Sequence, residues 1–150
     1  MIIAGNAPLS EPFVIWCLDL KNIADLLLAP SSFLIGIMET VVSTPCPLMM
    51  VMPGYDMMWF GGESSGSNLD WDGFLCWTQL QEDMIVVSAQ LTDWHDTSAW
   101  QAIELTEYFL ANFSVDVSRV YAAGYSAGGE TMSQAVPMRP DLYAAYLHGA

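Results

Sequence analysis

Short apolar runs alternate along the chain with stretches of helical periodicity. The runs are continuously apolar, which is typical of strands buried on both faces of a sheet. No helix is predicted between the first two runs, so these two strands are candidates for antiparallel pairing. A sixth strand is predicted to begin within residues 142–147. The five complete runs that predict strands are residues 13–18, 32–38, 47–54, 84–89 and 119–124.

Two helices are predicted between the third and fifth strands. One covers residues 71–82, and Asp70 is placed to cap its N-terminus. The clearer one covers residues 99–113, where apolar residues recur at helical spacing. Ser98 is followed three residues later by Gln101, a pattern that predicts a capping box at the start of this helix.

A third helix is predicted over residues 126–136, where Pro137 is expected to end it. From residue 47 onwards the order of strands and helices indicates βαβ units, and therefore an α/β fold with a mostly parallel sheet. Residues 55–70 are rich in Gly and Ser and are predicted to form a long loop.

Composition excludes several classes of function. Hydrophobic residues make up 53% of the 150 residues and charged residues 13%, which is too apolar for a disordered acidic tail. Three Lys and Arg oppose 17 Asp and Glu, giving a net charge of −14. This charge argues against nucleic acid and against an anionic membrane surface as partners. No apolar run reaches about 18 residues, so no transmembrane helix is expected. No signal peptide is recognisable at the N-terminus, and the localisation is left open.

No metal or cofactor site is predicted. The three cysteines are far apart and do not have zinc-ligand spacing, so buried free thiols are expected at Cys17, Cys46 and Cys76. Residues 93–96 group two carboxylates with an imidazole, but they stand directly before a predicted helix. Capping and loop hydrogen bonds are therefore favoured over metal binding at residues 93–96.

The segment Gly124-Tyr125-Ser126-Ala127-Gly128 carries the chemistry of the chain. It is a G-x-S-x-G motif that follows a predicted strand and opens a predicted helix, the context of a nucleophile elbow. In such a turn the serine hydroxyl stands clear of the strand end, and the helix N-terminus presents free N–H groups where negative charge develops. The alternative is a glycine-rich turn in which Ser126 merely caps the helix.

Residues 116–129 resemble the corresponding region of α/β-hydrolase serine esterases. The resemblance is to the polyhydroxybutyrate depolymerase and feruloyl esterase-like group and to its prolyl-oligopeptidase-family relatives. Residues 139–145 are similar to the segment that leads into the next strand, and residues 47–54 to the strand before the oxyanion-hole loop. The resemblance covers about residues 45–150, whereas residues 1–44 match no family. It implies one incomplete α/β-hydrolase domain over residues 1–150, with later strands missing.

The resemblance also implies roles for individual residues. Ser126 is the expected nucleophile, and the backbone N–H groups of Ala127 and Tyr55 are the expected oxyanion donors. Gly124 and Gly128 are the glycines of the elbow.

The sequence departs from the family in two respects. Pro53-Gly54 stands where the oxyanion loop often reads His-Gly. The family's triad follows the order Ser, Asp or Glu, then His, and the sequence stops at Ala150, before room for the last two. His95 and His148 are not at the family's histidine position. We therefore expect a truncated site, with neither imidazole in hydrogen-bond reach of Ser126.

The primary hypothesis is a serine hydrolase that cleaves carboxylic esters through an acyl-enzyme on Ser126. The alternatives are a prolyl-oligopeptidase-like serine peptidase and a non-catalytic α/β-hydrolase-like binding fragment. The expected partner is a small ester or peptide substrate, and the uncovered sheet edge is a candidate for self-association. Residues 57–60 form an apolar run that either lines the acyl pocket or packs in the core.

Overall fold

The computed structural model describes residues 14–19, 45–55, 71–80, 84–90 and 93–150. Within this part of the chain, one sheet contains five strands in the order β1-β3-β2-β4-β5, and every adjacent pair is parallel. The strands are β1 (Val14–Asp19), β2 (Cys46–Met52), β3 (Ile85–Gln90), β4 (Val115–Tyr125) and β5 (Ala145–Gly149).

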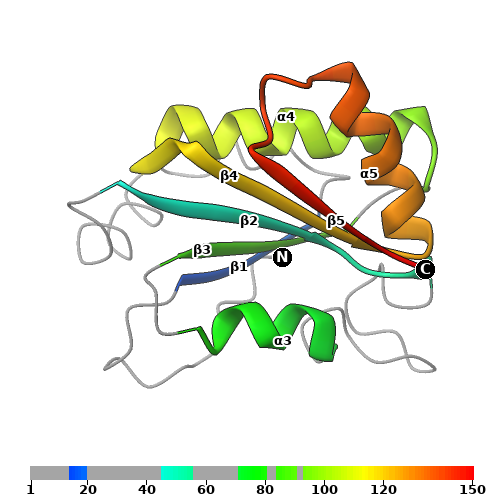
Figure 1. Cartoon of the computed structure of the whole chain (residues 1–150), viewed down its shortest axis with the longest axis horizontal. Coiled ribbons are helices and arrows are strands. Elements are labelled where there is room, and N and C mark those ends of the chain that lie inside the picture. The colour runs from blue at the N-terminus through cyan, green and yellow to red at the C-terminus, as the bar shows by residue number, and fades with distance from the viewer. Residues whose placement is uncertain (1–13, 20–44, 56–70, 81–83, 91–92) are drawn as a thin grey trace.

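Helices cover both faces of the sheet (Figure 1). Helix α3 (Asp72–Thr78) lies on one face, and α4 (Asp96–Asn112) and α5 (Ala127–Met138) lie on the other. This arrangement confirms the predicted α/β class with a parallel sheet. None of the helices in the described ranges is long and apolar enough to cross a bilayer.

The central strand β2 explains why its apolar run is continuous. Leu48, Met50 and Met52 pack into the core beneath α4 and α5. Met49 and Val51 point to the opposite face and pack with Phe74 of α3. Because successive side chains of a strand point to opposite faces, a strand covered on both faces needs apolar residues at every position.

Helix α4 begins earlier than the capping-box pattern predicts. Its N-cap residue is His95, and Ser98 lies inside the first turn, so the predicted cap at Ser98 is wrong. Asp93 instead accepts hydrogen bonds through Oδ1 from the N–H groups of His95 (2.9 Å) and Ser98 (3.3 Å). The hydroxyl of Ser98 accepts the N–H of Asp93 at 2.8 Å. Residues 93–96 thus form the capping loop that the sequence favoured.

Helix α5 continues through Pro137 to Met138, so the predicted stop at Pro137 is wrong. A proline removes the N–H that would donate to the carbonyl four residues earlier and crowds that carbonyl, and the helix continues for only one residue beyond it. The helix ends when the N–H of Arg139 donates to Ala135 O at 3.1 Å.

Two strands differ in length from their apolar runs. Strand β4 begins at Val115 rather than residue 119. Its first four residues are partly or fully exposed and alternate valine with Asp116 and Ser118, so they do not form a continuous apolar run. The Asp116 carboxylate there accepts hydrogen bonds from Ser118 and Arg119. Strand β5 begins at Ala145. Leu142 and Tyr143, in the apolar run that predicted this strand, are buried but lie before it.

Several predictions fall partly or wholly outside the described residues. They concern the strand at 32–38 and its pairing, the loop at 55–70 and the run at 57–60. The predicted helix at 71–82 is shorter in the structure, where α3 ends at Thr78 with Gln79 as its C-cap. The predicted cap at Asp70 is also wrong, because the N-cap residue of α3 is Trp71. Strand β1, which the sequence treated as a candidate for antiparallel pairing, runs parallel to β3.

The two described cysteine side chains are free thiols. Cys46 is buried, as expected. Cys76 is exposed, which corrects the prediction, because it lies on the solvent side of α3.

Candidate functional site

Ser126 occupies the junction between β4 and α5 with a strained backbone. Its φ is 51° and its ψ is −121°, and it is the one non-glycine residue with positive φ in the described part of the chain. The side chain is exposed. The predicted position of Ser126 between a strand and a helix is therefore confirmed. A conformation of this kind costs on the order of 1–3 kcal/mol and persists only where the surroundings impose it.

The spacing of the two glycines follows from close backbone packing around this turn. A Cβ on Gly124 would lie 2.5 Å from the carbonyl oxygen of Gly128. A Cβ on Gly128 would run into the carbonyl oxygen of Met52 and lie 2.5 Å from that of Pro53. The end of β4, the first turn of α5 and the end of β2 thus approach more closely than side chains allow.

Two backbone hydrogen bonds hold the turn itself. The N–H of Ser126 donates to Gly149 O of β5 at 3.0 Å, and the N–H of Glu130 donates to Ser126 O at 2.9 Å. The turn is therefore attached both to the neighbouring strand and to the first turn of its own helix.

The segment after β2 lies beside Ser126. A Cβ on Gly54 would be 3.5 Å from Ser126 Cβ and 3.4 Å from the ring of Tyr125. Gly54 therefore lies beside Ser126, after the end of β2. Ala127 opens α5, where the first N–H groups have no acceptor within the helix. The expected oxyanion donors, Tyr55 and Ala127, are the residues that follow Gly54 and Ser126, and their role stays a prediction.

Two aromatic pairs stand at the same edge of the sheet. Tyr55 meets Trp94 edge to face, with ring centroids 5.1 Å apart and planes at 88°. Tyr125 lies next to Trp71 at 5.8 Å. The sequence analysis gave no role to Trp71 or Trp94. Trp94 could have been found, because it follows β3 and therefore lies at the carboxyl edge of the sheet, where parallel sheets place their sites.

Neither histidine of the sequence hydrogen-bonds to Ser126. His95 is the N-cap residue of α4, and its ring packs against Trp94 at 5.3 Å. His148 lies in β5, with Nδ1 2.8 Å from Tyr146 Oη and 3.2 Å from Ser133 Oγ. The expectation that neither imidazole reaches the Ser126 side chain agrees with these partners. Within the described ranges, no hydrogen bond to Ser126 Oγ occurs.

The hydrogen bonds around His148 fix the position of its ring proton. The Tyr146 hydroxyl donates its single proton to Gly129 O at 2.8 Å, so Nδ1 of His148 must be the donor to Tyr146 Oη. Burial raises the pKa of Tyr146 above its usual value, and its hydroxyl stays protonated at neutral pH. His148 therefore ties β5 to α5 rather than serving Ser126 as a base.

The other titratable groups of the region have structural partners. Arg139 donates through Nε and Nη2 to Asp141, both at 2.9 Å, and through Nη1 to Glu107 of α4. Burial alone would raise the pKa of Asp93, but hydrogen bonds from His95 and Ser98 lower it overall. No cluster of three potential metal ligands occurs within the described ranges.

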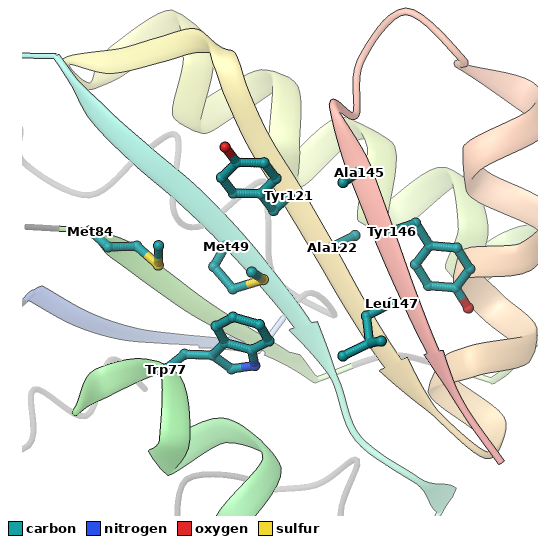
Figure 2. Close-up of a pocket in the computed structure, with 8 residues that line it drawn as sticks. All are labelled: Met49, Trp77, Met84, Tyr121, Ala122, Ala145, Tyr146 and Leu147. Atoms are coloured by element: carbon teal, nitrogen blue, oxygen red, sulfur yellow. The ribbon is translucent and has the colours of Figure 1, made fainter. Parts of the chain in front are cut away.

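An apolar groove of about 280 Å³ lies away from Ser126, beside α3 (Figure 2). Trp77 of α3, Met49 of β2 and Tyr121 of β4 contribute to its lining. Met49 and Tyr121 are register partners three residues before Met52 and Gly124, the last pair of β2 and β4 and about 10 Å further along the strands. Figure 2 also shows the ring of Tyr146 turned towards α5.

Comparison with known proteins places this geometry in context. The model of the prolyl oligopeptidase family matches residues 88–150. Feruloyl esterase B of Thermothelomyces thermophilus is 30% identical over 103 residues, covering 61% of this chain and 33% of that protein. The crystal structure of a thermostable esterase superposes with a TM-score of 0.55 at 18% identity, covering 73% of this chain and 34% of the other.

The chain thus spans about a third of the length of these two relatives. The similarity to α/β-hydrolase serine esterases that residues 116–129 predicted is confirmed. The parallel sheet with helices on both faces is part of an α/β-hydrolase fold.

Proposed function

We propose that this chain carries the nucleophile of a serine hydrolase that cleaves carboxylic esters. The observation that carries the proposal is the strained, exposed Ser126 at the strand–helix junction, with Gly54 in contact beside it. The comparisons support hydrolase chemistry in general, because the two similar proteins are named esterases and the matching family model is that of the prolyl oligopeptidases.

In the proposed reaction, Ser126 Oγ attacks the ester carbonyl carbon. The carbonyl oxygen becomes an oxyanion, and the N–H groups of Ala127 and Tyr55 stabilise its charge. The C–O bond to the alcohol then breaks, the alcohol takes up the proton that Ser126 released, and water hydrolyses the acyl-enzyme. In this proposal neither His95 nor His148 is the base that accepts the serine proton, because neither hydrogen-bonds to Ser126 and Nδ1 of His148 is held by Tyr146 and Ser133. In this proposal residues 1–150 supply the nucleophile and the oxyanion donors but not the base.

Two other functions remain as candidates. Cleavage of a peptide bond follows the same tetrahedral chemistry, and the prolyl oligopeptidase family match favours it as the second enzymatic candidate. A non-catalytic binding module is favoured by the absence of an imidazole at Ser126 within the described residues.

The test is covalent labelling of the 150-residue chain by a fluorophosphonate, with and without free imidazole as a base. Mass spectrometry of the Ser126 peptide measures the adduct, and Ser126→Ala is the control for specificity. With the oxyanion donors in place but no base, we expect labelling on the order of 10³–10⁴-fold faster than at an unassisted hydroxyl. Imidazole should raise the rate further at Ser126 than at N-acetylserine amide, a free serine that serves as the unassisted reference. Equal labelling of Ser126 and this reference under both conditions would contradict an activated nucleophile and favour the binding module.

A further inference from the structure

Gln134 connects the helix that begins after Ser126 to the loop before α4. Its side-chain amide uses both of its N–H groups. Nε2 donates to Trp94 O at 3.0 Å and to Glu130 O, one turn earlier in α5, at 3.1 Å. The first bond crosses from α5 to the capping loop, and the second holds the amide in the orientation that the first requires.

Trp94 carries this connection on to the segment after β2. Its indole is partly buried against the core beneath α4 and α5. Its ring meets Tyr55 edge to face at 5.1 Å, a geometry that aromatic pairs prefer. A displacement of the Trp94 backbone would therefore displace the surface on which the Tyr55 ring rests.

We infer that Gln134 is a positioning residue which, through Trp94, sets the place of Tyr55, the residue that follows Gly54. The inference rests on the proposed function, in which the Tyr55 N–H is an oxyanion donor. Helix α5 then positions both donors, Ala127 directly and Tyr55 through Gln134. An oxyanion hole depends on such fixed geometry, because its donors stabilise charge only where they already point to the developing oxyanion.

The test compares Gln134→Met, which keeps the length of the side chain but cannot donate, with Gln134→Lys, whose ammonium can donate to both carbonyls. Gln79→Met makes the same replacement at the exposed C-cap of α3 and is the matched control. The readouts are the maximal rate of Ser126 labelling and its half-saturating fluorophosphonate concentration, together with the amide chemical shift of Tyr55. Denaturant unfolding verifies that each variant is folded.

We expect Gln134→Met to lower the maximal labelling rate on the order of tenfold, because displacements near 1 Å at a reacting site have effects of this size and larger. The half-saturating concentration should stay unchanged, and the amide chemical shift of Tyr55 should change. Gln134→Lys should restore much of the rate, and Gln79→Met should behave as the wild type.

The outcomes separate this inference from the proposed function. If the wild type does not react at Ser126, the proposed function is wrong, and the inference is wrong with it. If the wild type reacts and Gln134→Met reacts equally fast, only the inference is overturned. A slower Gln134→Met with an unchanged amide chemical shift at Tyr55 would also overturn it, because the effect would then not pass through Tyr55.

Discussion

At Ser126 the backbone has a conformation that side chains disfavour, with φ at 51° and ψ at −121°. Glycine tolerates positive φ without the Cβ clash, so Ser126→Gly should release strain, whereas Ser126→Ala should retain it. Glycine also raises the entropy of the unfolded chain, which offsets part of the gain. We expect Ser126→Gly to be more stable than Ser126→Ala by about 1 kcal/mol in urea unfolding. The interpretation of Ser126 as a strained residue fails if the two variants have equal stability or if the alanine variant is the more stable.

At the level of single residues, the serine and its glycines were predictable and the groups around them were not. Gly124 and Gly128 stand two positions on either side of Ser126, and this spacing is local information. Trp94 and Gln134 are 40 residues apart and meet through one hydrogen bond. Their contact depends on how α5 packs beside the loop before α4, which periodicity does not specify.

Among the elements, α5 and β2 make the closest approach of the site, because Gly128 packs on the carbonyl groups of Met52 and Pro53. A methyl group there meets backbone that cannot turn aside, so Gly128→Ala should lower the free energy of unfolding by about 2 kcal/mol, within the range for overpacking. Gly54→Ala is the control, since its methyl group would make ordinary contacts at 3.4 and 3.5 Å. Its unfolding free energy should stay within about 1 kcal/mol of the wild type. A Gly128→Ala variant as stable as Gly54→Ala would show that α5 is free to move away from β2.

The ends of the elements were less predictable than their existence. The pattern at Ser98 and Gln101 resembles a capping box, yet Asp93 lies close enough to accept the N–H groups of both His95 and Ser98. A carboxylate is a strong acceptor for such donors. It allows the helix to begin at Asp96, two residues before the predicted cap. Where two capping residues compete within one turn, sequence alone does not determine which one is used.

Over the whole molecule, continuous apolar runs predicted a parallel sheet, but the order of its strands required the structure. β2 lies between β3 and β4, and β3 lies between β1 and β2, so neighbours along the chain are not always neighbours in the sheet. The runs at β2 and β3 are similarly apolar, and nothing in their composition distinguishes a central strand from its neighbour.

The whole-molecule charge leads to a prediction about salt. The sequence has a net charge of −14 with three basic side chains, and two of these, Arg119 and Arg139, already pair with carboxylates at 2.7 and 2.9 Å. Repulsion among the remaining acidic groups opposes the folded state, because folding brings them closer together. Added salt shortens the screening length from about 30 Å at 0.01 M to about 8 Å at 0.15 M. Salt should therefore weaken this repulsion more than it weakens the two short ion pairs.

We expect the melting temperature to rise by about 3 °C between 0.01 and 0.15 M NaCl, which corresponds to roughly 1 kcal/mol for a chain of this size. Glu104→Gln removes one exposed carboxylate from α4 and should raise the melting temperature at low salt while reducing the effect of NaCl. Sucrose, which stabilises folded proteins without screening charge, should act equally on the wild type and the variant. A melting temperature that falls or stays constant with NaCl would show that the ion pairs of Arg119 and Arg139 outweigh the repulsion, and that the excess of acidic side chains does not limit the stability of the fold.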